Sequence, residues 1–226
     1  MMRIFSEIVR RKKGEKKCLF LSMGSLLFFF LFFACTSSDS VDYGLGEYYV
    51  EITTALGDNA FLLDSGKTIQ SVGGETGRSY EAGDRVFLNF SYIEGSADQI
   101  TIHASAKIVL GTLTPVEEKD IEAFANDPIR LESAWIGDHY LNLRIYMEYQ
   151  SEKHKIGLFT DKERLDQPEI IVYFLHDANN DPPGYPTSLY LSFDLEGALG
   201  EPEGNKILQI HFNTTNYGQK IYELNY

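Results

Sequence analysis

Alternation of apolar and polar residues with a period of two is the feature that most constrains this 226-residue chain. Over most of its length, short alternating runs are separated by turn-forming Gly, Asn, Asp and Pro, which is the pattern of half-buried β-strands. The stretch RVFLNFSYI shows it clearly, because Val86, Leu88, Phe90 and Tyr92 share one face. The pattern predicts an all-β fold.

Two groups of strand candidates predict two domains. About five candidates in residues 47–113 are enough for a small OB-like β-barrel. Seven candidates in residues 114–226 suggest a β-sandwich. The clearest of them is HYLNLRIYMEY, whose alternation puts on one face Leu141, Leu143, Ile145, Met147 and Tyr149. Between the groups, Thr114 and Pro115, with Glu117 three positions after the threonine, resemble a helix start. We therefore expect one short helix near the domain boundary, within the segment TPVEEKDIEAFANDP.

The first 34 residues differ from the rest and predict an export signal. Residues 1–17 hold seven basic and two acidic residues, and residues 18–34 carry no charge. A basic region followed by an apolar core and a small residue is typical of a secretory signal peptide. The apolar core is at the lower edge of what spans a bilayer, so an uncleaved N-terminal anchor is the alternative.

Cys35 follows this apolar core directly and is the only cysteine outside the first 34 residues, since the other is Cys18. No disulfide can therefore form within residues 35–226. A lone cysteine after a small residue, here Ala34, predicts lipid attachment at Cys35 and a stable acyl anchor in the membrane. The Phe32–Phe33 pair departs from the usual lipobox, and an ordinary signal peptide with an incidental cysteine is the alternative. Residues 35–46 would then form a flexible tether.

The charge balance argues against a nucleic-acid partner. The chain has 20 Lys and Arg, seven of them in residues 1–17, and 33 Asp and Glu, two of them there. The remaining 13 basic and 31 acidic residues give residues 35–226 a formal net charge of −18. A surface this acidic repels phosphate backbones.

Several segments together carry a family resemblance. They are YYVEITTALGDNAFLLDSGKTI, YEAGDRVFLNFSYIEG, DHYLNLRIYMEY, KHKIGLFTD and YFLHDANNDPPGYPTSLYLSFDL. Residues 47–224 resemble the NigD-like lipoproteins of Bacteroidetes. The resemblance implies an OB-like N-terminal domain, a C-terminal β-sandwich and an outer-membrane lipoprotein, on the cell surface or the periplasmic face. It also implies a bacteriocin-immunity role as one alternative, and it brings no active-site motif.

The loop HDANNDPPGYP is the most suggestive polar stretch. Asp177, Asn179 and Asp181 have the spacing of the first three oxygen ligands of a calcium loop. Pro182 stands where such a loop has glycine, and Ser188 stands where it has the bidentate glutamate. A plain strand-connecting loop, rich in turn-forming residues, is the alternative.

Catalytic motifs are not evident. The five histidines form no HxH or HExxH pattern, and no G-x-S-x-G motif occurs. His103 and His211 fall within strand patterns. Glu148, Asp194 and Glu196 are examples of the many carboxylates, among which a linear sequence cannot select a catalytic pair. We therefore expect no enzymatic activity and no cofactor, and a hydrolase with a site assembled at long range is a minor alternative.

Tyrosines near predicted loops and strand ends suggest a ligand surface instead. OB-like barrels bind oligomers on one face, and aromatic rings stack on sugars, although core packing explains tyrosines as well. Trp135 is expected in the sandwich core or at the domain junction, without a ligand role. The leading prediction is a lipid-anchored envelope protein that binds a glycan or a protein partner. The tyrosines concerned are Tyr43, Tyr48, Tyr49, Tyr185, Tyr190 and Tyr217.

Overall fold

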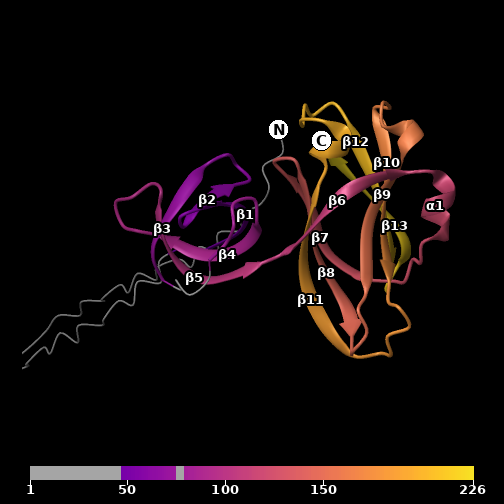
Figure 1. Ribbon diagram of the computed structural model, residues 1–226, viewed down its shortest axis with the longest axis horizontal. Coiled ribbons are helices and arrows are strands. Elements are labelled where there is room, and N and C mark those ends of the chain that lie inside the picture. Colours follow the sequence, from indigo (N-terminus) through magenta and orange to yellow (C-terminus); the bar gives the residue numbers. More distant parts are fainter. Residues whose placement is uncertain (1–46, 75–78) are drawn as a thin grey trace, which may run out of the picture. The chain divides into compact units, whose positions relative to one another are not determined.

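The computed structural model describes residues 47–74 and 79–226, which form thirteen strands, two short α-helices and one 3-10 helix. Figure 1 shows the strands coloured from indigo to yellow along the chain. The predictions for the signal peptide, Cys35 and the tether lie outside these residues. No helix in the described part is long and apolar enough to cross a membrane. The all-β prediction is confirmed.

The first five strands close into a barrel in the order β1-β2-β3-β5-β4. The β3–β5 pair is parallel and the other pairs are antiparallel, as in an OB-like barrel. Asp58 and Asn59 join β1 to β2 with positive φ angles of 49° and 61°, which is the geometry of a tight hairpin turn. The strands are β1 (Tyr49–Gly57), β2 (Ala60–Leu63), β3 (Thr68–Gly74), β4 (Arg85–Tyr92) and β5 (Gln99–Lys107).

The barrel core follows from the alternation in β4. Val86, Leu88 and Phe90 are fully buried inside the barrel, and Tyr92 packs against the same core. Arg85 and Phe87 therefore point outward, because successive side chains of a strand point to opposite faces. The predicted inner face of this strand is confirmed.

The other eight strands form one rolled sheet in the order β13-β12-β10-β9-β6-β11-β8-β7. The first half of β6 pairs with β11 and its second half with β9, so this one strand joins the two layers of the sandwich. A bridge between Ile129 and Thr214 brings the two ends of the sheet together. The strands are β6 (Val109–Val116), β7 (Arg130–Gly137), β8 (Tyr140–Tyr149), β9 (Lys155–Asp161), β10 (Glu169–Asp177), β11 (Tyr185–Asp194), β12 (Ile207–Thr214) and β13 (Gly218–Asn225).

The segment that follows the barrel differs from the prediction. Thr114 and Pro115 belong to β6, where Pro115 lies opposite Thr160 of β9, and they do not start a helix. The helix α1 (Glu118–Ala123) begins after Glu117, which makes no side-chain capping hydrogen bond. Pairing with β9 outweighs the local capping pattern here. The barrel strands end at β5, and the strands of the second sheet begin with β6.

Two further one-turn elements, η1 (Lys162–Arg164) and α2 (Glu196–Leu199), lie between sandwich strands. The sandwich core lies between its two layers. Leu141, Leu143 and Ile145 of β8 are fully buried, and Phe174 and Phe212 face them from the other layer within the same cluster. The predicted inner face of β8 is confirmed as far as Met147, whereas Tyr149, at the end of the strand, is exposed.

Arg85 joins the barrel to the sandwich. Its side chain is only 1% exposed, and it forms a bidentate ion pair with Asp64 at 2.7 and 3.0 Å. All five guanidinium N–H groups have an acceptor, which offsets the cost of burying the charge. The other acceptors are Thr54 of the barrel and Asn142 and Ser192 of the sandwich, and the guanidinium stacks 4.0 Å from the Tyr140 ring centre.

Gly137 shows how closely the two domains approach each other at this point. A Cβ atom on Gly137, at the end of β7, would collide with the Asp64 carboxylate. The backbone of the sandwich therefore packs directly against the carboxylate that holds Arg85.

We expect Arg85→Ala to lower the free energy of unfolding by about 3–5 kcal/mol, because it leaves the Asp64 carboxylate buried without its partner. Urea denaturation of the full chain measures this. Lys107→Ala, which removes an exposed ion pair with Asp84, is the control and should leave the urea midpoint unchanged. An Arg85→Ala midpoint equal to that of the control would contradict the assigned role.

Glu51 of β1 supplies a test that depends on pH. Burial, and then the nearby Asp64 carboxylate, raise the pKa of Glu51 above its ordinary value of about 4.3. The folded state therefore holds this proton more tightly than the unfolded state, and the ionised carboxylate destabilises the fold at neutral pH.

Glu51→Gln should consequently raise the melting temperature at pH 7.5, and the gain should shrink as the pH falls towards 4. Thermal denaturation at several pH values checks this, with Glu94→Gln at an exposed position as the matched control. A gain that is independent of pH would show that the charge of Glu51 is not the cause.

Candidate functional site

An arginine–aromatic face covers the outer side of strands β7, β8 and β11. We define it as Arg130, Trp135, Arg144, Tyr146 and Tyr190. The register of the sheet creates this face, because Arg144 lies opposite Tyr190 on one side and Ser133 on the other, while Arg130 lies opposite Tyr146. The inward neighbours of these residues fill the sandwich core, so this face points away from it.

The two arginines stack on the aromatic rings of this face. The Arg130 guanidinium lies 4.1 Å from the Tyr146 ring centre, and that of Arg144 lies 5.5 Å from the Tyr190 ring centre. Arg144 Nη2 also donates a hydrogen bond of 3.1 Å to the Tyr146 hydroxyl. The buried Arg144 Nε has no hydrogen-bond partner among the described residues. A buried donor without a partner is costly, so a ligand oxygen at this position would be stabilising.

A groove of about 320 Å³ runs beside this face, between the barrel and the sandwich. The Phe87 ring of the barrel packs against the Tyr190 ring of the sandwich, with the ring centres 4.9 Å apart, and both residues line the groove. Trp135 lies in the groove wall, which places it at the domain junction, one of its two predicted positions. The full lining is Val50, Glu51, Ile52, Asp64, Phe87, Ser133, Trp135, Arg144 and Tyr190.

Both charge signs meet in the groove. Arg144 supplies a cation on the sandwich side, and Glu51 and Asp64 supply carboxylates on the barrel side. Asp64 is committed to Arg85, while burial raises the pKa of Glu51. Such a groove can hold an apolar or aromatic group and, beside it, an acidic or hydrogen-bonding group on Arg144. It offers binding geometry and no arrangement of a nucleophile with a base.

The two carboxylates of the calcium prediction have other partners in this structure. Asp177 pairs with Lys155 at 3.2 Å and accepts the Asn179 N–H. The Asp181 carboxylate is buried and accepts three backbone N–H groups, those of residues 150–152. N–H donors therefore already occupy oxygens of both carboxylates in this structure, and the calcium site stays a prediction. In the part of the chain that is described, no group of three or more His, Cys, Asp and Glu residues could hold a metal ion.

The histidines fall into separate environments. His103 of β5 and His211 of β12 lie on strand faces, as predicted; His103 contacts Ser91 at 2.9 Å, and the His211 ring packs 5.1 Å from that of Tyr173. Burial lowers the pKa of His211. His139 lies 2.9 Å from Asp138. The two remaining histidines, at positions 154 and 176, contact each other.

The carboxylates singled out in the sequence do not form a catalytic pair. Glu148 is exposed on β8. Asp194 accepts the backbone N–H of Glu196 at 2.9 Å, and Glu196 begins the one-turn helix α2. The contact between Asp194 and Glu196 is therefore a local turn hydrogen bond.

The predicted tyrosine surface does not assemble. Tyr49 packs into the barrel core, and Tyr48 packs against His103. Tyr185 starts β11 and Tyr217 lies in the turn between β12 and β13, with exposures of 83% and 76%. Of the described members of this set, Tyr190 alone lines the groove. Tyr43 lies outside the described residues.

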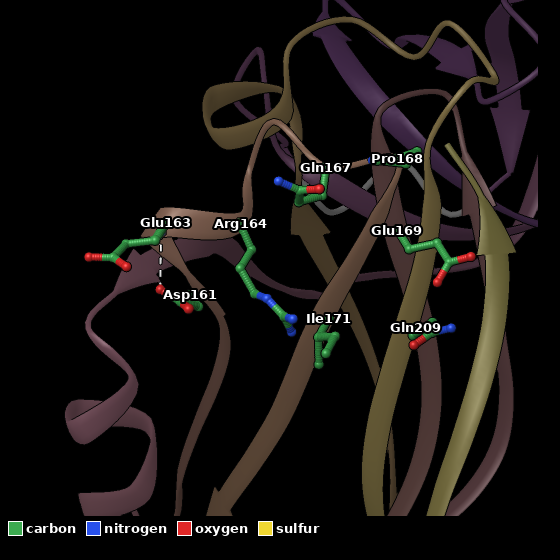
Figure 2. A pocket seen from close by; sticks show the side chains of 8 residues that line it. All are labelled: Asp161, Glu163, Arg164, Gln167, Pro168, Glu169, Ile171 and Gln209. Atoms are coloured by element: carbon green, nitrogen blue, oxygen red, sulfur yellow. Dashed lines mark hydrogen bonds between the residues drawn. The ribbon is translucent and has the colours of Figure 1, made fainter.

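A larger but more polar hollow lies beside η1 and strands β10 and β12 (Figure 2). It has a volume of about 600 Å³. In Figure 2, Arg164 extends towards Ile171, and Glu163 points away from it, with its backbone N–H bound to Asp161. Charged and amide groups dominate the lining, and it has no aromatic side chain. We regard it as a solvated surface hollow.

Sequence reasoning missed the arginines of the candidate site. The alternation in β8 already put Arg144 on the face opposite the core. What the sequence could not show is the register of three strands far apart in the chain, which brings Trp135, Arg144 and Tyr190 together.

Comparisons with solved structures show the same fold in other proteins. A candidate toxin-related protein of Parabacteroides distasonis is 21% identical, with a TM-score of 0.68, over 80% of this chain and 93% of that one. A NigD-like immunity protein of Bacteroides caccae is 20% identical, with a TM-score of 0.60, over 80% and 92%. A candidate lipoprotein of Bacteroides fragilis is 12% identical, with a TM-score of 0.61, over 80% and 98%.

The sequence itself matches a family model. No curated protein matches the chain. Residues 112–226 match the model of the NigD-like C-terminal β-sandwich domain. This match covers just over half of the chain and nearly all of the sandwich strands, so the protein belongs to the NigD-like family.

Proposed function

We propose that this protein is a lipid-anchored protein of the bacterial envelope that binds a partner protein without catalysing a reaction. The arginine–aromatic face beside the 320 Å³ groove carries this proposal. The two arginines of this face stand out in a chain whose residues 35–226 carry a formal net charge of −18.

The composition of the face favours a protein as the partner. Trp, Tyr and Arg are the residues most enriched among those that contribute strongly to protein–protein binding. Here Trp135, Tyr190 and Arg144 lie together at a groove, with one arginine nitrogen left without a partner. A glycan is the weaker candidate, because no ring contact joins the exposed tyrosines to one another among the described residues: Tyr48 precedes β1, Tyr185 starts β11 and Tyr217 lies in the turn before β13.

Bacteriocin immunity is the specific form of this function that the family suggests. A similar structure from Bacteroides caccae is described as a NigD-like immunity protein. In this form the partner is a toxin, and the face described above intercepts it at the envelope. The net negative charge of residues 35–226 would attract a basic toxin over longer distances.

The location in the envelope rests on the N-terminal sequence. The uncharged residues 18–34, Ala34 and Cys35 together have the pattern of a lipoprotein signal. Several acyl chains on Cys35 would hold the protein at the membrane, because each buried methylene contributes about 0.8 kcal/mol.

Cys35→Ser should abolish palmitate labelling and move the protein into the soluble fraction. Metabolic labelling and membrane fractionation of the host bacterium measure both effects. Cys18→Ser, in the discarded segment, is the matched control and should leave labelling intact. A Cys35→Ser protein that stays membrane-bound with an uncleaved N-terminus would show a signal anchor instead.

The binding proposal predicts that cells without the protein lose protection and that variants of the face bind the toxin more weakly. Deletion of the gene should sensitise cells to one bacteriocin, and the wild-type gene should restore survival. Trp135→Ala and Arg144→Ala should each weaken binding of that toxin about 30-fold or more, equivalent to 2 kcal/mol or more for a residue central to an interface. Isothermal titration calorimetry with the purified toxin measures this.

Arg164→Ala is the matched control for the binding proposal, because it removes an arginine from the other hollow (Figure 2). It should bind and protect like the wild type. Unchanged survival of the deletion strain against the toxins of neighbouring strains would exclude the immunity form. Retention of a sugar on a glycan array, lost in Trp135→Ala, would replace the protein partner by a glycan.

A further inference from the structure

Three electron-pair donors converge at the end of the sandwich away from the groove. His154 Nδ1 lies 2.9 Å from His176 Nε2 and 3.1 Å from the Met147 sulfur. Met147 belongs to β8, His154 to the connection between β8 and β9, and His176 to β10. All three are at least nine-tenths buried, with exposures of 7% for Met147, 5% for the His154 side chain and 3% for His176.

The outer nitrogen of His154 faces an acceptor. His154 Nε2 lies 3.1 Å from Asp181 Oδ2. The Asp181 carboxylate also accepts the backbone N–H groups of Gln150, Ser151 and Glu152. An ionised carboxylate can only accept hydrogen bonds, so His154 Nε2 carries the proton. When this ring carries only that proton, Nδ1 has a free electron pair.

His176 is arranged in the same way. Its Nδ1 lies 3.3 Å from the backbone carbonyl oxygen of Asp127, which can only accept, so Nδ1 carries the proton and Nε2 has the free electron pair. Two imidazole electron pairs and a thioether sulfur therefore point at one another.

Such a meeting is unfavourable unless a positive charge lies between the donors. A single proton on His154 Nδ1 would bridge the two nitrogens, and the Met147 sulfur would accept it only weakly. A soft metal ion would use all three donors. Thioether and imidazole ligands together select copper(I), whereas zinc prefers thiolate, imidazole and carboxylate.

We propose that Met147, His154 and His176 form a copper(I)-binding site with one sulfur and two nitrogen ligands. The surrounding contacts are those of a metal site, because metal-bound histidines usually donate their other N–H to a carboxylate or a backbone carbonyl. Here Asp181 and the Asp127 carbonyl have these roles.

The site needs only a small adjustment to hold the ion. Two nitrogens bound to one metal at about 2.0 Å lie about 3.3 Å apart, so the two rings must separate by about 0.4 Å. His154 lies in a loop between two strands, which can move by this amount. A cavity of about 550 Å³ leads to the site, and Met147, His154, His176 and Asp181 line it.

The test is copper(I) binding by the full chain in detergent under anaerobic conditions, with ascorbate as the reductant. The wild type should retain one equivalent of copper(I) against a chromogenic chelator. X-ray absorption at the copper edge should show one sulfur and two nitrogen neighbours. Met147→Leu should weaken binding at least about tenfold, and Asp181→Asn about 10- to 100-fold, the usual effect of losing such a supporting contact.

His103→Gln is the matched control, because it removes a histidine from β5 of the barrel, whereas all three proposed ligands belong to the sandwich, and it should bind copper(I) like the wild type. Met147→Leu conserves volume, and circular dichroism confirms that it folds. Equal affinities of the wild type and Met147→Leu would overturn the proposal. A folded wild type that retains no copper(I) would overturn it as well. The contact between His154 and His176 would then be a hydrogen bond.

Discussion

The buried ion pair between Arg85 and Asp64 is the interaction on which the two-domain arrangement depends. Arg85 belongs to a barrel strand, yet its guanidinium also binds Asn142 and Ser192 of the sandwich. Burying a charge is tolerated only when every donor finds an acceptor, and all five donors do so here. The close approach of Gly137 to Asp64 leaves no space for another side chain.

This junction also shapes the candidate site. The outward residues of β1 and β4 meet those of β8 and β11, and the groove lies where this contact ends. Trp135, Arg144 and Tyr190 form the sandwich side of the groove, and residues of the barrel form the other side. Neither domain alone would form this groove. The copper(I) site lies elsewhere, at loops of the sandwich, and its ligands come from β8, β10 and the connection after β8.

The alternation of residues predicted most of the fold because a strand with one buried face must alternate. It succeeded in β4 and β8, where the inner faces are as expected. It failed at Thr114 and Pro115, since a local capping pattern cannot reveal that β9 offers these residues a strand partner. The spacing of Asp177, Asn179 and Asp181 likewise could not reveal that Asp181 binds backbone N–H groups from a loop about 30 residues away in the chain.

The sequence by itself determined the strand content, the inner faces of strands such as β4 and β8, the acidic charge and the family resemblance, because each of these depends on the order of residues along the chain. The tertiary structure decided which outward residues became neighbours. In the sequence, Arg144 is one of several polar residues in an alternating strand. The register between β8 and β11 places it beside Tyr190, and together they line the groove with residues of the barrel. His154 and His176 are isolated in the sequence, and only the pairing of β9 with β10 brings their nitrogens within 2.9 Å of each other.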